Sequence, residues 1–111
     1  MIYQESNELK KSLKFWYRLP GHYHGSENYS VFAPRLEIIN YYMEELRKYG
    51  WEFIAEEDNV EKSNGKKVEE KYIFRNGTYE LQISFPVETT VNFEGVVYEK
   101  SYYIMVFPID R

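Results

Sequence analysis

The sequence predicts an α+β fold in which one main α-helix, about residues 34–49, packs on an antiparallel sheet of four or more strands in a meander. Three observations predict this fold. Apolar residues recur at helical spacing across 34–49, polar and apolar side chains alternate between residues 51 and 85, and residues 101–107 (SYYIMVF) are almost continuously apolar. We expect residues 1–111 to form a single domain, since this length supports one hydrophobic core.

The helix carries sequence signals at both ends. Pro34 suits the first helical position, where a missing N–H costs no hydrogen bond, and Gly50 suits the left-handed stop. Lys48 lies in the last turn, where a cation complements the helix dipole. Tyr41 falls among polar residues, so we expect it to be more exposed than its neighbours. The predicted core face of the helix consists of Leu36, Ile39, Met43 and Leu46.

Three strands are predicted after the helix, at residues 51–56, 67–75 and 78–85. Asn64-Gly65 and Asn76-Gly77 lie between them and are typical of hairpin turns. Trp51 and Phe53 adjoin the helix stop, and we expect both to anchor the centre of the core. One buried face of the last of these strands is predicted to consist of Tyr79, Leu81, Ile83 and Phe85.

The remaining segments leave alternatives open. Residues 1–19 fit either a short helix or a strand near 13–19, and residues 29–32 fit a strand that would complete an N-terminal hairpin. Residues 87–100 form either one long strand with a bulge or a loop that leaves the sheet, because Glu94-Gly95 interrupts the alternation. Residues 101–107 are expected at the centre of the sheet, or covered on both faces.

The composition indicates a folded protein with many tyrosines. Apolar residues make up 43% and charged residues 29% of the chain, which argues against disorder. Aromatic residues reach 19%, with twelve tyrosines and seven phenylalanines. Tyrosine has a large apolar body and a polar tip. The tyrosines therefore indicate either a thin, half-buried sheet or a recognition surface.

Cysteine content and hydropathy bear on the cellular compartment. The chain has no cysteine, which excludes disulfides, thiolate metal sites and cysteine nucleophiles. No apolar run approaches 18 residues, so no membrane span is predicted, and the N-terminus lacks the pattern of a signal peptide. We expect a cytoplasmic protein. A processed exported domain is the alternative.

The charge is unevenly distributed along the chain. The net charge is -4. Residues 1–50 hold seven basic and six acidic residues, whereas residues 51–111 hold seven basic and twelve acidic ones. Nucleic-acid binding is disfavoured, because phosphate contacts require lysine and arginine. A basic protein is the partner that this balance favours.

His22 and His24 are the most conspicuous candidates for chemistry. Together with a carboxylate such as Glu27 they could hold a metal ion, and histidine also serves as a general acid or base. The favoured interpretation is that both lie in the loop PGHYHGSEN and face solvent. The chain carries no catalytic or cofactor-binding motif. We therefore predict no catalytic residue, no metal site and no cofactor.

An acidic run follows the helix. Paired carboxylates can hydrolyse glycosides or hold divalent cations, but no EF-hand pattern is present here. The two main interpretations are a solvated strand end and a contact patch for a basic partner. On the second interpretation, the predicted partner-binding residues are Glu56, Glu57, Asp58, Glu61, Tyr41 and Tyr23.

These observations predict a small, non-enzymatic protein-binding protein. In size and charge the chain resembles immunity proteins, which implies an inhibitor that masks a basic partner such as a toxin. One alternative is a ligand-binding or enzymatic α+β domain with a tyrosine-lined pocket. Another is the soluble part of a processed envelope protein. The sequence does not determine the oligomeric state.

Overall fold

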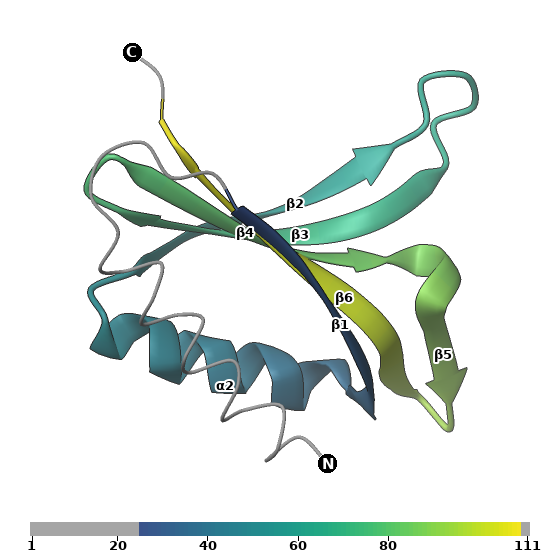
Figure 1. The fold of residues 1–111 in the computed structure, drawn as a ribbon. Coiled ribbons are helices and arrows are strands. Elements are labelled where there is room, and N and C mark those ends of the chain that lie inside the picture. Colours follow the sequence, from purple (N-terminus) through teal and green to yellow (C-terminus); the bar gives the residue numbers. More distant parts are fainter. Residues whose placement is uncertain (1–24, 110–111) are drawn as a thin grey trace.

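The computed structural model describes residues 25–109, and these residues form one helix and a six-stranded antiparallel sheet. Helix α2 (Arg35–Lys48) lies across one face of the sheet (Figure 1). The predicted α+β fold is confirmed, and the predicted helix is correct to within one residue at each end. The predictions for residues 1–24, including those for His22, Tyr23 and His24, lie outside the described residues.

The sheet is largely a meander with one added strand. Its order is β1-β6-β4-β3-β2, and β5 pairs with β6 outside this path. The bounds are β1 Gly25–Pro34, β2 Glu52–Val60, β3 Lys67–Asn76, β4 Tyr79–Pro86, β5 Thr90–Phe93 and β6 Val96–Pro108. Residues 101–107 therefore lie in β6, between β1 and β4, which confirms their central placement.

The two predicted Asn-Gly turns connect β2 to β3 and β3 to β4. Gly65 and Gly77 both have positive φ, at 70° and 60°, a conformation that glycine adopts without steric cost. The side chain of Asn64 accepts a hydrogen bond of 2.8 Å from the Lys66 N–H. The β2–β3 hairpin extends away from the helix and the rest of the sheet (Figure 1).

The segment 87–100 contains elements that the sequence did not resolve. It forms a short 3-10 helix, η1 (Val87–Thr89), and a further hairpin in which β5 pairs with β6. Glu94 and Gly95 form the tip of this hairpin, with φ values of 53° and 80°. Positive φ values at two successive residues are typical of two-residue hairpin turns, whose backbone twist matches that of the two strands they connect. Glu94-Gly95 is thus a turn between two strands.

The predicted core face of the helix is partly wrong. Leu36 is 73% exposed and Met43 is half-buried, whereas Ile39 and Leu46 are buried as expected. The buried face is rotated, and it consists of Ile38, Ile39, Tyr42, Glu45 and Leu46. One reason is that a tyrosine can be buried when its hydroxyl has a hydrogen-bond partner. The Tyr42 hydroxyl lies 2.7 Å from that of Tyr102, so Tyr42 can occupy the buried face of the helix.

The centre of the core also differs from the prediction. Trp51 is buried at 4% exposure, but Phe53 is 42% exposed because it lies on the outermost strand. Tyr41 is half-buried and packs against the core, so it is more exposed than Tyr42 but less exposed than Asn40. The predicted face of β4 is confirmed, since Leu81, Ile83 and Phe85 are fully buried and Tyr79 packs against them. No helix within residues 25–109 is long and apolar enough to span a membrane.

Candidate functional site

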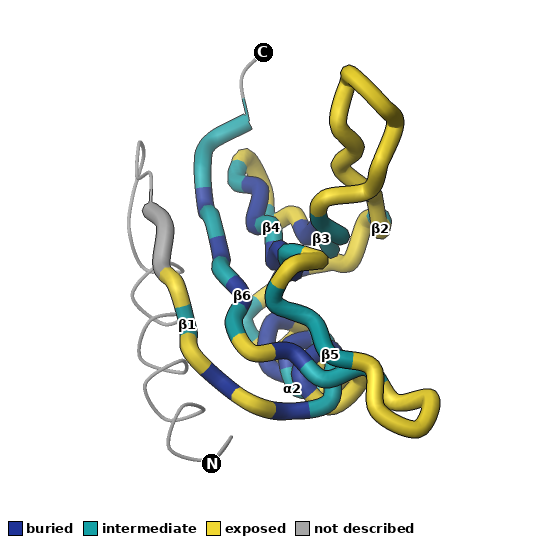
Figure 2. The backbone as a smooth tube through the Cα atoms, turned by 90° about the vertical axis from the view of Figure 1, so that its right-hand side faces the viewer, coloured by how far each residue is buried: buried dark blue, intermediate teal, exposed yellow. Residues whose placement is uncertain are grey.

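The strand β2 is exposed along almost its whole length. Eight of its nine residues are exposed, and Ala55 is the exception. Its four charged side chains are all acidic, and we call them the acidic edge: Glu52, Glu56, Glu57 and Asp58. The strand occupies one end of the sheet order, which explains why so little of it is covered (Figure 2).

The acidic edge projects from both faces of the sheet. Glu56 and Asp58 lie opposite Tyr72 and Glu70 of β3, and Glu57 lies opposite Lys71. Burial first, and then the neighbouring Glu56 carboxylate, together raise the pKa of Tyr72 to about 12. Tyr72 therefore remains neutral and does not add to the charge of this edge.

Part of this negative charge is balanced within the hairpin. The Lys67 ammonium lies 3.9 Å from the Asp58 carboxylate and 2.9 Å from that of Glu70. Because Lys67 is well exposed, these ion pairs contribute little to stability. Glu56 and Glu57 take part in no salt bridge within the described residues.

The structure groups only some of the predicted partner-binding residues. Glu56, Glu57 and Asp58 are consecutive on β2, and exposed Glu61 follows in the turn. Tyr41 lies on α2, where its ring makes an edge contact with that of Tyr42 and packs against the core. Tyr23 lies outside the described residues.

A hollow of about 480 Å³ lies beside the start of β2. Its apolar walls come from Met43, Trp51, Phe53 and Phe74, and Arg47 and Glu52 supply one charge of each sign. The indole Nε1 of Trp51 is buried and has no hydrogen-bond partner among the described residues. A buried donor without an acceptor costs about 1–3 kcal/mol.

A second hollow, of about 490 Å³, lies between the β2–β3 turn and η1. Its walls carry both charges, with Glu61, Glu69 and Glu88 beside Lys66 and Lys67. Neither of these two hollows is lined by a tyrosine.

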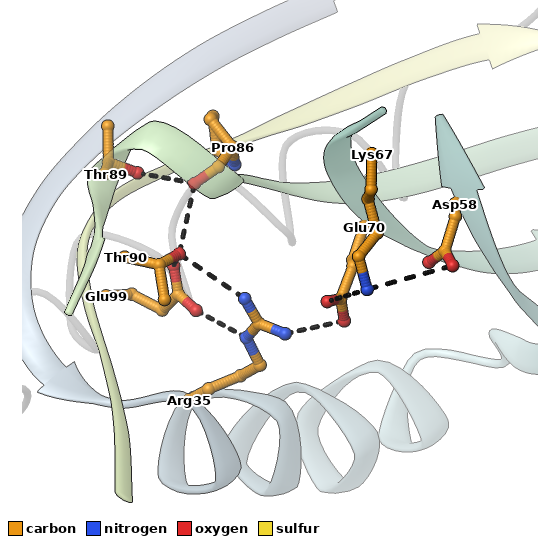
Figure 3. Close-up of polar contacts among 8 residues, drawn as sticks. All are labelled: Arg35, Asp58, Lys67, Glu70, Pro86, Thr89, Thr90 and Glu99. Carbon is orange, nitrogen blue, oxygen red and sulfur yellow. Dashed lines mark hydrogen bonds and ion pairs between the residues drawn. The ribbon is translucent and has the colours of Figure 1, made fainter. Parts of the chain in front are cut away.

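A partly buried ion network lies at the start of α2 (Figure 3). Arg35 donates from Nε to Glu99 of β6 and from Nη1 to Glu70 of β3, the latter at 2.6 Å. Thr90 of β5 donates to Glu99 Oε1 at 3.1 Å. The Arg35 guanidinium also lies 5.3 Å from the centre of the Phe85 ring, within cation–π range. This network therefore joins the helix to three strands of the sheet.

Glu99 is the most deeply buried charged group of the network, with a fully buried side chain. Burial raises its pKa above the ordinary value, while the hydrogen bond and charge of Arg35 oppose the rise. Neither hollow described above is lined by Arg35 or Glu99. The ion pairs of Arg35 with Glu99 and Glu70 connect the start of the helix to the sheet.

Sequence reasoning missed this network because its members are far apart along the chain. Arg35 and Glu99 are separated by 64 residues, and Arg35 and Glu70 by 35. One signal was present: a cation in the first helical turn opposes the helix dipole, so its presence at Arg35 implies a compensating acid nearby.

The tyrosines gather in the core as well as on the surface. Tyr42 and Tyr102 are buried with their hydroxyls bonded, and the Tyr29 ring stacks on that of Tyr102 at 5.3 Å. Burial raises the pKa of Tyr42 well above its ordinary value, so this hydroxyl stays protonated. These three residues serve packing.

Residues 25–109 contain no group of three or more histidine, cysteine, aspartate or glutamate side chains arranged to hold a metal ion. Comparisons with protein-family models, curated proteins and solved structures found no match to this chain.

Proposed function

We propose that this protein binds another, basic protein through the acidic edge of β2, as an inhibitor or immunity protein would bind its target. One observation carries the proposal: every charged side chain of β2 is acidic, and all four are exposed. A strand that only needed solubility could carry either sign of charge. Carboxylates of one sign at one end of the sheet attract a basic surface and speed association.

The position of the acidic edge supports the same proposal. The β2–β3 hairpin extends from the body of the protein, so a large partner can reach it from outside the sheet (Figures 1 and 2). Exposed apolar side chains, Phe53, Ile54, Val60 and Val68, accompany the charges on this hairpin. Protein interfaces combine apolar contacts with charged groups in this way.

A differential capture experiment tests the proposal. The wild-type chain, an edge-reversal variant (Glu56→Lys, Glu57→Lys, Asp58→Lys) and a control variant (Glu44→Lys, Glu88→Lys, Glu94→Lys) are immobilised and exposed to a lysate of the source cells. The two variants have the same net charge, and all six residues are exposed. We expect a basic protein that the wild type and the control retain and the edge-reversal variant loses.

Kinetics with the purified captured protein complete the test. Reversal of the edge should lower the association rate constant by about tenfold or more, and added salt should lower it for the wild type. Equal retention by all three immobilised proteins, or association rates that do not depend on salt, would contradict the proposed function.

A further inference from the structure

The outer side of β2 offers an unpaired backbone edge. In the part of the chain that the structure describes, β2 pairs only with β3 and no strand lies on its other side. Its nine residues exceed the typical strand length of about five to six. An exposed edge of this length carries a row of free N–H and C=O groups on which another strand can pair.

The edge lacks several features that prevent strand addition. Natural edges are often blocked by proline or by lysine, and β2 contains neither. Register irregularities occur near both ends, between Phe53 and Ala55 and between Asn59 and Val60. From Ala55 to Asn59 the register with β3 is continuous, so the middle of β2 is a regular template.

The charge of the edge determines which strand can pair with it. In a second copy of β2 the same acids would face one another, and like charges on neighbouring strands are destabilising. Glu56 and Asp58 project from one face and Glu57 from the other, so basic side chains are favoured on either face of an added strand. The hollow walled by Trp51, Phe53 and Phe74 adjoins the same strand and can receive an apolar side chain.

We propose that β2 binds its partner by strand addition, taking an extended segment in which basic and apolar residues alternate. This inference rests on the proposed function, because it assumes that the partner is basic. It adds that the affinity comes from main-chain hydrogen bonds along Ala55–Asn59 as well as from charge. Strand addition of this kind is an established mode of peptide recognition.

Synthetic peptides separate backbone pairing from charge. The probe is a peptide of about nine residues in which lysine alternates with valine, the same length as β2. Alternate residues of a strand direct their N–H groups to opposite edges. One variant peptide is N-methylated at the valines, a second at the interior lysines, and a third at both. All four peptides have the same side chains and charge.

Isothermal titration should show that the unmethylated peptide binds and that methylation of both edges weakens binding by about tenfold or more. At least one singly methylated peptide should bind within about threefold of the parent, because one edge remains free to pair. In hydrogen exchange, amides in Ala55–Asn59 should gain protection when the parent peptide is bound. Amides of the central strand β4 should not change.

The outcomes distinguish the two proposals. No binding of the unmethylated peptide, or equal binding of the doubly methylated one, would overturn strand addition. If the doubly methylated peptide still binds and the edge-reversal variant does not bind it, the acidic edge acts by charge alone and the proposed function stands. If the edge-reversal variant binds the peptides as well as the wild type does, the acidic edge has no role and the proposed function fails as well.

Discussion

Glu99 shows how one residue can couple the helix and the sheet at an energetic cost. Its carboxylate is removed from water, and Arg35 and Thr90 supply the compensating hydrogen bonds. Arg35 is shared with Glu70, so a single guanidinium serves two carboxylates. The raised pKa of Glu99 indicates that this compensation is incomplete, because burial outweighs the ion pair.

The raised pKa predicts how stability depends on pH. The folded protein holds the Glu99 proton more tightly than the unfolded chain, whose ordinary value is 4.5. The stabilisation from this proton is fully present below that value and is lost as pH rises through the raised folded pKa. Glu99→Gln cannot ionise. The free energy of unfolding of the variant minus that of the wild type should therefore increase with pH across this window.

Urea denaturation at a series of pH values, from about pH 3 to 7, measures this difference. Its size should be about 1.4 kcal/mol for each pH unit by which the pKa is raised. Glu94→Gln, at an exposed turn, provides the control for loss of one negative charge. A difference that decreases with rising pH would mean that the Arg35 ion pair outweighs burial.

At the scale of single elements, the sequence was most informative where apolar residues recur at a single spacing, either that of a helix or that of a strand. The bounds of α2, the two Asn-Gly turns and the buried face of β4 all follow from local patterns, and the structure confirms them. The rotation of the helix could not be predicted from the spacing of its apolar residues alone, because it depends on the ion pairs of the partly buried Arg35 and on the bonded hydroxyl of Tyr42. Arg35 and Tyr42 both turn toward the sheet and carry Leu36 outward.

The helix rotation leads to a contrast between two leucines. Leu46 is 0% exposed, so Leu46→Ala should lower the free energy of unfolding by about 2–5 kcal/mol. Leu36→Ala should change it by no more than about 0.5 kcal/mol, because most of this side chain is already in water. Chemical denaturation of both variants checks the pair. Equal losses would mean that the originally predicted face is the buried one.

The candidate site was only partly predictable, for a different reason. The run Glu56-Glu57-Asp58 was visible in the sequence, and its location on an exposed strand follows from the structure. Tyr41 was assigned to the same surface because it interrupts a polar helix face, yet its ring packs against the core. The open edge itself depends on β1 joining the sheet beside β6 and not beside β2, a long-range pairing that no local pattern specifies.

At the scale of the whole molecule, acidic side chains from the more acidic second half of the sequence lie at one end of the sheet. The acidic strand β2 is at one end of the strand order and β1 is at the other. An edge with this charge repels its own copies while remaining open to basic strands. Acidic side chains can therefore serve two purposes on β2: they prevent self-association, as charged residues do on other edge strands, and they select a partner.

The first of these purposes can be tested without any partner. Replacing Glu56→Gln, Glu57→Gln and Asp58→Asn keeps the size of each side chain and exchanges one carboxylate oxygen for an NH2 group. These changes remove the charge repulsion between two copies of β2. At about 0.2–1 kcal/mol for each like-charge cross-strand contact, about three such contacts cost about 0.6–3 kcal/mol, so the association constant should rise by about threefold or more. Sedimentation velocity over a range of concentrations measures the association constant.

The matched variant Glu44→Gln, Glu88→Gln and Glu94→Gln loses the same charge at exposed sites away from β2 and should sediment as the wild type does. If both variants associate equally, net charge and not the β2 edge controls self-association. If neither does, β2 is blocked by features other than its carboxylates, and strand addition by a basic segment would meet the same obstacle.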